Sequence, residues 1–295
     1  MADLTNEFLT TKQLADLLHI KERKVYELAA SDEVPCSRAT GKLLFPRRAI
    51  EQWVARHSTG ILADRSARDS QVFFGSHDPL LEWSLRTSGA ELATYFDGSL
   101  DGLERFGRGK GVATGIHMFD PETGDWNLAA VRVRFGHAPV ALIEFAWRER
   151  GLIVIPGTES EFADVTALKG HRVVPRQDGS GSQVLLRHLM EQAALGLNDI
   201  EWADTARTES DAALGVLERK ADAAFGLRAL AQQLRLGFVP LARERFDVLV
   251  DRAAWFDQPL QRLFNFCRTS AFRAKAEDLA GYDVSGFGTI HFNGG

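Results

Sequence analysis

Two short amphipathic segments near the N-terminus, separated by only a few residues, constrain the fold of this chain most strongly. Thr10 is placed to cap the first helix, because its side chain can bond to the Gln13 amide while the Gln13 side chain bonds back. The apolar residues of this helix recur at helical spacing and predict one buried stripe, formed by Leu14, Leu17 and Leu18. After a short turn at 19–20, residues 21–30 fit a second helix.

The second predicted helix has one apolar and one basic face. Val25 and Leu28 are expected to face a core. The outward side carries the residues that could contact DNA, namely Lys21, Arg23, Lys24 and Tyr26. Two short helices joined by a tight turn form the helix-turn-helix, whose second helix enters the major groove. The alternative is an ordinary helical hairpin with solvated lysines.

Residues 36–46 predict a β-hairpin with two basic side chains near its tip, Arg38 and Lys42. A third helix over residues 47–56 would then cover the core with its apolar residues, Ile50, Trp53 and Val54. The order of helix, turn, helix, basic hairpin and closing helix favours the DNA-binding interpretation over the helical hairpin.

This order of elements over residues 8–57 resembles the excisionase-type, MerR-like winged helix-turn-helix. In that family the second helix enters the major groove, and the wing touches the DNA backbone or the minor groove. The resemblance implies a recognition helix that carries Lys21, Arg23, Lys24 and Tyr26, and a wing that carries Arg38 and Lys42. The family's wing often has an extra Gly or Trp, which this chain lacks.

The charge distribution favours a sequence-specific DNA binder over a protein that coats DNA. The net charge is −5, with +1 in residues 1–60 and −6 in residues 61–295. Because the acidic bulk would repel phosphate, we expect a local basic face whose contacts are doubled by dimerisation. The expected partners are therefore double-stranded operator DNA and a second copy of the chain, in a homodimer or a dimer of dimers.

Apolar content and cysteine usage indicate the cellular compartment. No apolar stretch approaches a membrane span, and residues 1–20 lack the basic start and apolar core of a secretory signal. Cys36 and Cys267 fall in different predicted domains, so we expect free thiols in a reducing cytosol. These features predict a cytoplasmic protein without a membrane partner.

Beyond the first domain the sequence predicts an α/β fold. We expect the winged helix-turn-helix at residues 1–58, a polar linker at 59–70 and an α/β domain at 71–295. Short apolar runs that alternate with helical patterns are typical of a mostly parallel sheet. Strands are predicted at 71–75, 91–96, 140–145, 152–155, 171–174 and 200–203. Helices are predicted from residue 78, from residue 99, at 180–195 and at 209–219.

Three loops that follow predicted strands place Ser and Gly at the start of a helix: residues 75–79, 98–102 and 178–183. Such residues let the backbone approach a ligand, and exposed amides at a helix N-terminus favour an anion. Ser and Asp also cap helices where no ligand binds. Three such loops in one domain leave both interpretations open.

The larger domain contains three motifs in this order: GSHDPLL at residues 75–81, GIHMFD with TGDWN at 115–127, and RQDGSGS at 176–182. They resemble the periplasmic-binding-protein-like domain that is fused to helix-turn-helix regulators and also to molybdopterin-biosynthesis proteins. The resemblance implies a type II fold with two α/β lobes around a cleft, between which the chain crosses near 146–152 and 240–247. Lobe one would span about 71–147 and 246–295, and lobe two about 150–242.

The loops and the resemblance together nominate a set of ligand-binding residues. They are Ser76, His77, Ser99, His117, Arg176, Gly179, Ser180, Gly181, Ser182 and Gln183. His117 could equally be hydrogen-bonded within the adjoining turn. The family's third motif more often ends in Arg or Thr-Arg where this chain has Ser182-Gln183, which removes a cation from the predicted cleft.

These observations predict a one-component transcriptional regulator that binds operator DNA and senses a small anion. The resemblance favours molybdate, tungstate or a molybdenum-cofactor species as effector. One alternative is an organic anion bound as in LysR-like effector domains, which Trp126, Phe225 and Arg228 would suit if they line the cleft. Another is an enzyme of molybdopterin metabolism. We expect no catalytic site, because adjacent Ser76, His77 and Asp78 cannot form a triad. We expect no metal or cofactor site either, because Asp120 and Glu122 are better suited to shaping a turn and the phosphate-loop and dinucleotide fingerprints are absent.

Overall fold

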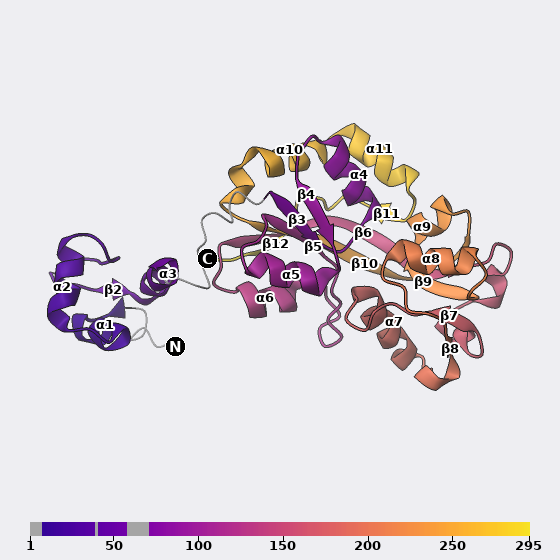
Figure 1. Ribbon diagram of the computed structural model, residues 1–295, viewed down its shortest axis with the longest axis horizontal. Helices are drawn as coiled ribbons and strands as arrows, with labels where there is room; N and C mark the ends of the chain where they lie inside the picture. The colour runs from indigo at the N-terminus through magenta and orange to yellow at the C-terminus, as the bar shows by residue number, and fades with distance from the viewer. Residues whose placement is uncertain (1–7, 39–40, 58–70) are drawn as a thin grey trace. The chain divides into compact units, whose positions relative to one another are not determined.

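The computed structural model describes residues 8–38, 41–57 and 71–295 (Figure 1). The chain divides into two compact units, an N-terminal unit (residues 1–65) and a larger unit (residues 66–295). The predicted linker at 59–70 lies outside the described residues, as does the centre of the predicted hairpin at 39–40. Within the described part of the chain, no helix has both the length and the apolar character needed to cross a membrane.

The N-terminal unit contains three helices and a short two-stranded sheet. Its elements are β1 (Phe8–Leu9), α1 (Thr11–Leu18), α2 (Glu22–Ala30), β2 (Phe45–Pro46) and α3 (Arg47–His57). The predicted capping box is present, since the Thr10 amide donates to Gln13 Oε1 at 2.8 Å and the Gln13 amide donates to Thr10 Oγ1 at 3.3 Å. β1 and β2 pair antiparallel, so the segment before α1 lies beside the segment before α3.

The core of the N-terminal unit differs from the predicted stripe at one position. Leu14, Val25 and Ile50 are fully buried, but Leu17 is 46 % exposed. The buried side of α1 lies between Leu14 and Ala15, which are 100° apart on a helix, and this direction turns Leu17 toward solvent. The expectation that Leu17 belongs to the core was therefore wrong.

A backbone bridge between Ser37 and Leu44 closes the loop that follows α2. The Ser37 amide donates to the Leu44 carbonyl at 2.7 Å, and the Leu44 amide returns a bond of 2.9 Å. This antiparallel pair lies where the sequence predicts the base of a hairpin, on both sides of the residues that are not described. The first unit is thus a helix-turn-helix followed by the base of a wing.

The larger unit is built on a ten-stranded sheet with the order β4-β3-β5-β10-β6-β9-β7-β8, and β11 and β12 also pair with β6. The first strands are β3 (Val72–Gly75), β4 (Ala93–Phe96), β5 (Ala113–Ile116), β6 (Val140–Val154) and β7 (Arg172–Val174). They are followed by β8 (Glu201–Trp202), β9 (Ala223–Leu227), β10 (Gly237–Asp251), β11 (Tyr282–Asp283) and β12 (Ile290–Asn293).

Two features of this sheet correct the sequence predictions. The expected strands at 140–145 and 152–155 are parts of one 15-residue strand, β6, which pairs antiparallel with the equally long β10. The sheet is therefore mixed, with parallel pairs only among β3, β4 and β5 and among β7, β8 and β9. β10 has register shifts at 240–242 and 246–247, within the segment expected to cross between lobes. The lobe boundaries themselves stay a prediction.

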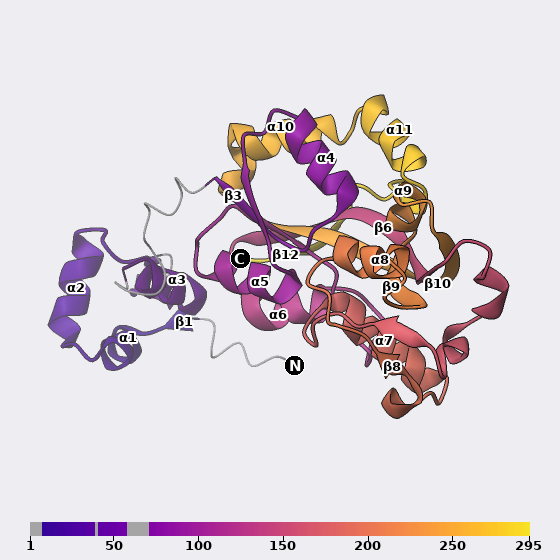
Figure 2. The ribbon, with the colours of Figure 1, turned by 45° about the vertical axis from the view of Figure 1, so that its right-hand side comes forward.

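Helices cover both faces of the sheet (Figures 1 and 2). They are α4 (Pro79–Thr87), α5 (Ser99–Gly107), α6 (Leu128–Phe135), α7 (Gly181–Gln192), α8 (Glu209–Leu217), α9 (Arg228–Gln233), α10 (Gln258–Phe266) and α11 (Ser270–Asp278). Apolar residues of α4, α10 and α11 pack together against one face of β3, β6 and β10. Residues of α5 and α6 pack against β5, β6 and β10 in a separate cluster.

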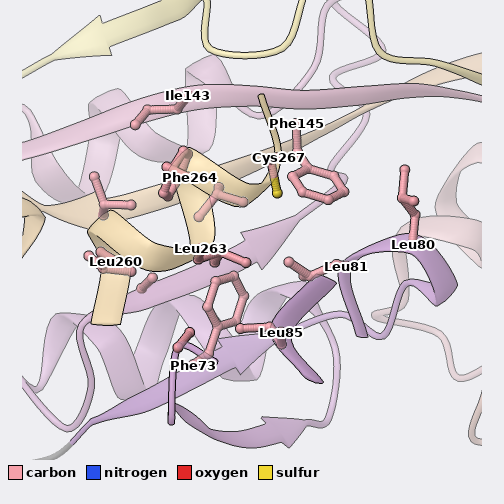
Figure 3. Packing of buried hydrophobic residues seen from close by; sticks show 14 of the residues in the cluster. Phe73, Leu80, Leu81, Leu85, Ile143, Phe145, Leu260, Leu263, Phe264 and Cys267 are labelled. Atoms are coloured by element: carbon pink, nitrogen blue, oxygen red, sulfur yellow. The ribbon is translucent and has the colours of Figure 1, made fainter. Parts of the chain in front are cut away.

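The largest core cluster lies beneath α4, α10 and α11 and is closely packed (Figure 3). The Phe145 ring contacts Phe246, Phe272 and Phe287 edge-on, with ring centroids 5.6–6.0 Å apart. Cys267 also belongs to this cluster, and burial raises the pKa of its thiol to about 12. Both cysteines are free thiols, as expected.

Replacing Phe145 by alanine should lower the free energy of unfolding of the larger unit by about 3–5 kcal/mol, because the surrounding rings cannot close the cavity. Phe145 is 2 % exposed. The control is Phe256→Ala, whose ring is 80 % exposed and whose loss should change stability by less than about 0.5 kcal/mol. Urea unfolding of the full chain, followed by circular dichroism, measures both. Equal effects of the two substitutions would contradict this description of the core.

Candidate functional site

A cavity of about 240 Å³ lies at the carboxyl ends of β3, β4 and β5, opposite the starts of α7 and α8. In open α/β sheets this edge is where ligands bind. Nine of the predicted ligand residues line it: Ser76, His77, Ser99, His117, Arg176, Gly179, Ser180, Gly181 and Ser182. The structure thus brings together residues that are more than 100 positions apart in the sequence.

Three helix N-termini meet at the cavity. The N-cap residues of α5, α7 and α8, which are Gly98, Ser180 and Thr208, all line it. Unpaired amides in the first turn of a helix, together with the helix dipole, favour negative charge. The convergence of three such ends makes the cavity electrostatically suited to an anion.

The cavity serines also have partners within the protein. Ser180 Oγ accepts from the Gln183 amide at 3.2 Å, so it caps α7 as the alternative interpretation expected. Ser76 Oγ and Ser99 Oγ lie 2.8 Å apart, and Ser99 Oγ also accepts from the His117 amide at 3.1 Å. These hydroxyls therefore hold the cavity wall in place, and they line the space that a ligand would occupy.

The two sides of the cavity touch at Gly181. A Cβ atom at this position would lie 2.2 Å from the His117 carbonyl oxygen and 2.8 Å from His117 Nδ1. Both distances are shorter than any real contact, so only glycine allows α7 to approach the end of β5 this closely. Nearby, the Phe119 and His188 rings pack with centroids 4.7 Å apart. The two sides of the cavity are therefore in direct contact at this point.

A buried ion-pair network extends from β6 to the cavity. On β6, Arg148 bonds to Asp78 at 2.8 Å and also to Glu244. Arg150, on the same strand, contacts Glu244 at 2.6 Å and Glu209 at 2.9 Å. The network reaches the cavity wall at Glu209, which forms an ion pair with Arg176 at 2.9 Å and accepts a hydrogen bond from Ser182. Charged groups from β6, β10, the start of α4, the loop before α7 and the start of α8 are thereby joined next to the site.

The network fixes the protonation states of its members. Burial alone would raise the pKa of Glu244, but the charges of Arg148 and Arg150 lower it to about 2. Burial opposes ionisation of Glu209 too, yet Arg150 and Arg176 hold its pKa well below the usual range. Both side chains are therefore carboxylates at neutral pH.

A second buried carboxylate lies on β10, beside the register shift at Phe246. Burial raises the pKa of Asp247 to about 6, against the opposing effects of Arg245 and Asn127. Arg245 also reaches Asp125 at 3.0 Å and the Trp126 carbonyl at 2.7 Å, which ties β10 to the turn after β5.

Some residues named from the sequence lie elsewhere. Gln183 does not line the cavity, because its side-chain oxygen accepts from the Arg176 amide at 2.8 Å. Trp126 and Phe225 are buried in a hydrophobic cluster, and Arg228 bonds to Glu149 at 2.7 Å. None of these three lines the cavity, so they give no support to an organic-anion effector.

The sequence analysis missed one wall of the cavity, formed by Arg207, Thr208 and Glu209 at the start of α8. The signal was available, since this segment follows a predicted strand and begins a capped helix, as the three named loops do. Arg207 is exposed, and among the described residues no ion pair reaches its guanidinium. Arg207 therefore places a positive charge at the cavity, although the third motif of this chain, at Ser182-Gln183, contributes none. Asp97 and Asp101 also line the rim.

In the N-terminal unit, the predicted DNA-contacting residues lie on the surface. Lys21, Arg23, Lys24 and Tyr26 are exposed on or beside α2. Arg38 donates to the Ala29 carbonyl at 2.7 Å, which ties the wing to the end of α2. Together with Tyr26 and Lys42, Arg38 borders an open groove of about 450 Å³ between α2 and the wing.

Acid should weaken the larger unit through Glu244. Its pKa falls from 4.5 to about 2 in the folded protein, so its contribution, of order 3 kcal/mol, is present above about pH 4.5 and lost as the pH falls toward 2. Urea unfolding of the wild type should therefore show a steep loss of stability below pH 4.5. Glu244→Gln should flatten that slope, and the exposed control Glu104→Gln should not. The same slope in wild type and Glu244→Gln would rule out this assignment.

Comparisons with known proteins agree with the two-unit description. The family model described as PBP superfamily domain matches residues 82–268, and the one described as helix-turn-helix domain matches residues 8–58. The uncharacterized protein YvgK of Bacillus subtilis (strain 168) is 25% identical over 301 residues, which cover 95% of this chain and 96% of that protein.

Similar solved structures include an ancestral amino acid-binding protein, a precursor of cyclohexadienyl dehydratase. It has 12% identity and a TM-score of 0.49, and the match covers 70% of this chain and 93% of that chain. Peb3 from Campylobacter jejuni has 11% identity and a TM-score of 0.47, over 72% of this chain and 98% of that chain.

The two family models together describe a DNA-binding regulator with a ligand-binding domain. The larger unit supplies the α/β fold and the cavity, and the smaller unit supplies the helix-turn-helix. The model of the PBP superfamily domain matches more than half of the chain. This chain therefore belongs to that family, and a helix-turn-helix domain precedes the PBP domain.

Proposed function

We propose that this protein is a one-component transcriptional regulator that binds operator DNA and responds to a small anion. The observation that carries the ligand part is the convergence of three helix N-termini on one 240 Å³ cavity. Backbone amides and hydroxyls in that cavity match the acceptors of an oxyanion without requiring one cation for each charge.

The charges around the cavity support an anion that is held mainly by neutral donors. Arg176 contacts Glu209 at 2.9 Å, and Arg150 contacts the same carboxylate. Arg150 also pairs with Glu244, so both guanidinium groups already have carboxylate partners, which leaves Arg207 at the rim to attract the ligand. A small, dehydrated oxyanion suits this arrangement.

For the identity of the effector, we propose molybdate, tungstate or a molybdenum-cofactor species. The three sequence motifs support this choice through their resemblance to domains attached to molybdopterin-biosynthesis proteins. The small volume of the cavity also favours a compact ligand over a larger organic anion. We propose a sensor and not an enzyme of molybdopterin metabolism, because the helix-turn-helix would serve no purpose in that chemistry.

We propose that closure of the cleft transmits the signal. A ligand can shift the protein only if it binds one arrangement of the lobes better than the other. Gly181 on one wall lies against His117 on the other. A ligand that bridges both walls would therefore stabilise the arrangement in which the walls are in contact. In a homodimer or a dimer of dimers assembled through the larger unit, this change would alter the spacing of two DNA-binding units.

Arg23→Ala or Lys24→Ala should weaken operator binding without unfolding the protein, because both side chains are exposed on α2. Loss of a base contact should cost about 1–3 kcal/mol and relax specificity, and loss of a phosphate contact should weaken all sequences alike. Fluorescence anisotropy at fixed salt measures both effects.

The control for this prediction is Arg108→Ala. Arg108 pairs with Glu104 four residues away, as Arg23 pairs with Glu27, but it lies at the C-terminal end of α5, in the larger unit. If Arg23→Ala and Lys24→Ala both bind operator DNA like the Arg108 variant, α2 is not the reading helix.

Ser76→Ala and Ser180→Ala should each reduce ligand affinity. A hydrogen bond to a charged group contributes about 1.5–3 kcal/mol, so we expect losses of about tenfold to a hundredfold. Calorimetry on the full chain, with molybdate, tungstate, sulfate, phosphate and simple carboxylates, identifies the ligand and measures the losses.

Thr269→Ala is the control for the loss of a helix cap. Thr269 caps α11 through the Phe272 amide at 3.3 Å and does not line the cavity. It should therefore lower stability and leave affinity unchanged. If both serine variants bind the identified ligand as the wild type does, the serines are only helix caps.

A further inference from the structure

His117 is the one buried histidine that lines the cavity, within the described part of the chain. It follows β5, is 4 % exposed and stacks on Phe246 with ring centroids 6.0 Å apart. Its Nδ1 lies 3.2 Å from Glu244 Oε2. The ring is therefore held in one orientation by contacts on one edge and one face.

The contact with Glu244 determines which ring nitrogen carries the proton. Arg148 and Arg150 keep Glu244 ionised, and a carboxylate can only accept hydrogen bonds. Nδ1 must therefore be the donor. Burial lowers the pKa of His117, with Glu244 opposing this effect, so the ring is neutral and Nε2 has a free lone pair.

His117 lines the cavity, and because Nδ1 is taken by Glu244 and one ring face by Phe246, Nε2 is the ring nitrogen left for a ligand. No described residue forms a hydrogen bond with it. The helix N-termini and hydroxyls around the cavity offer donors, whereas Nε2 offers an acceptor. A fully deprotonated oxyanion also has only acceptors, so its oxygen and Nε2 would repel each other unless a proton lay between them.

On the basis of the anion-sensing function proposed above, we propose that His117 determines specificity by requiring one proton between Nε2 and the ligand. A ligand that carries its own hydrogen donates it to Nε2 and binds without proton exchange. A proton-free oxyanion binds together with a proton from solvent, which adds to Nε2 and leaves His117 as an imidazolium that donates to the ligand.

The charged groups around His117 are consistent with this coupling. Glu244 on β10 favours the imidazolium, and Arg148 and Arg150 on β6 oppose it. Glu209 at the start of α8 interacts with His117 electrostatically, and Gly181 at the start of α7 lies against the ring. The balance keeps the ring neutral in the empty cavity, and a bound anion adds the negative charge that makes protonation favourable.

The test is isothermal titration calorimetry of the wild-type full chain with molybdate and sulfate as proton-free probes. Measurements in two buffers of different ionisation enthalpy give the number of protons taken up. We expect close to one proton for each anion bound, and an affinity that falls about tenfold per pH unit between about pH 6.5 and 8.5. Hydrogenphosphate, which carries its own proton in this range, should bind without uptake.

Two variants assign the proton to its site. In His117→Asn, the amide can still reach Glu244, but nothing replaces Nε2, so proton uptake should disappear and molybdate should bind more weakly at low pH. His137→Asn, which removes an exposed histidine outside the cavity, should behave as the wild type.

The outcomes separate this inference from the proposed function. Molybdate or sulfate binding without proton uptake, or uptake that persists in His117→Asn, would overturn the role of His117 and leave the anion sensor intact. If no anion of the panel binds the wild type, both the sensor function and the inference are wrong.

Discussion

The buried ion pairs between β6 and β10 are the interaction on which the larger unit depends. Arg148 and Arg150 are almost completely enclosed, and the charge of each is neutralised only because carboxylates arrive from distant parts of the chain. A buried charge that lost its partner would be strongly destabilising, so these contacts require one register between the strands. They also require the starts of α4 and α8 to sit at fixed positions, and the cavity is formed as a consequence.

Much of the site could be predicted from local sequence, because capped helix starts after strands have a recognisable pattern. Four of the segments that line the cavity lead from a strand into a helix. Three of them were named in this way, and the fourth, at Arg207, has the same pattern. The continuous β6 could not be found, because Glu144, Arg148 and Arg150 interrupt its apolar run and resemble a solvent-exposed crossing. Their burial depends on partners such as Glu209 and Glu244, which no local pattern reveals.

The N-terminal unit shows the same division between local and tertiary information. Its helix boundaries follow from the capping box and the apolar spacing, so they were predictable. The exposure of Leu17 was not, because the direction of the core depends on how α1 meets α2 and α3. Likewise the bond from Arg38 to the Ala29 carbonyl joins segments whose contact the sequence does not specify, and this bond positions the wing.

The pairing of the cavity arginines with Glu209 and Glu244 has a consequence for how the proposed regulator would respond to ionic strength. Contacts between basic side chains and DNA phosphates release counterions, so operator affinity should fall steeply as salt rises. In the proposed anion sensor the ligand would be held mainly by amides and hydroxyls, and the buried ion pairs are shielded from the solvent. Ligand binding should therefore fall with salt much less steeply than operator binding. A rise in salt would release the protein from the operator well before it empties the cavity.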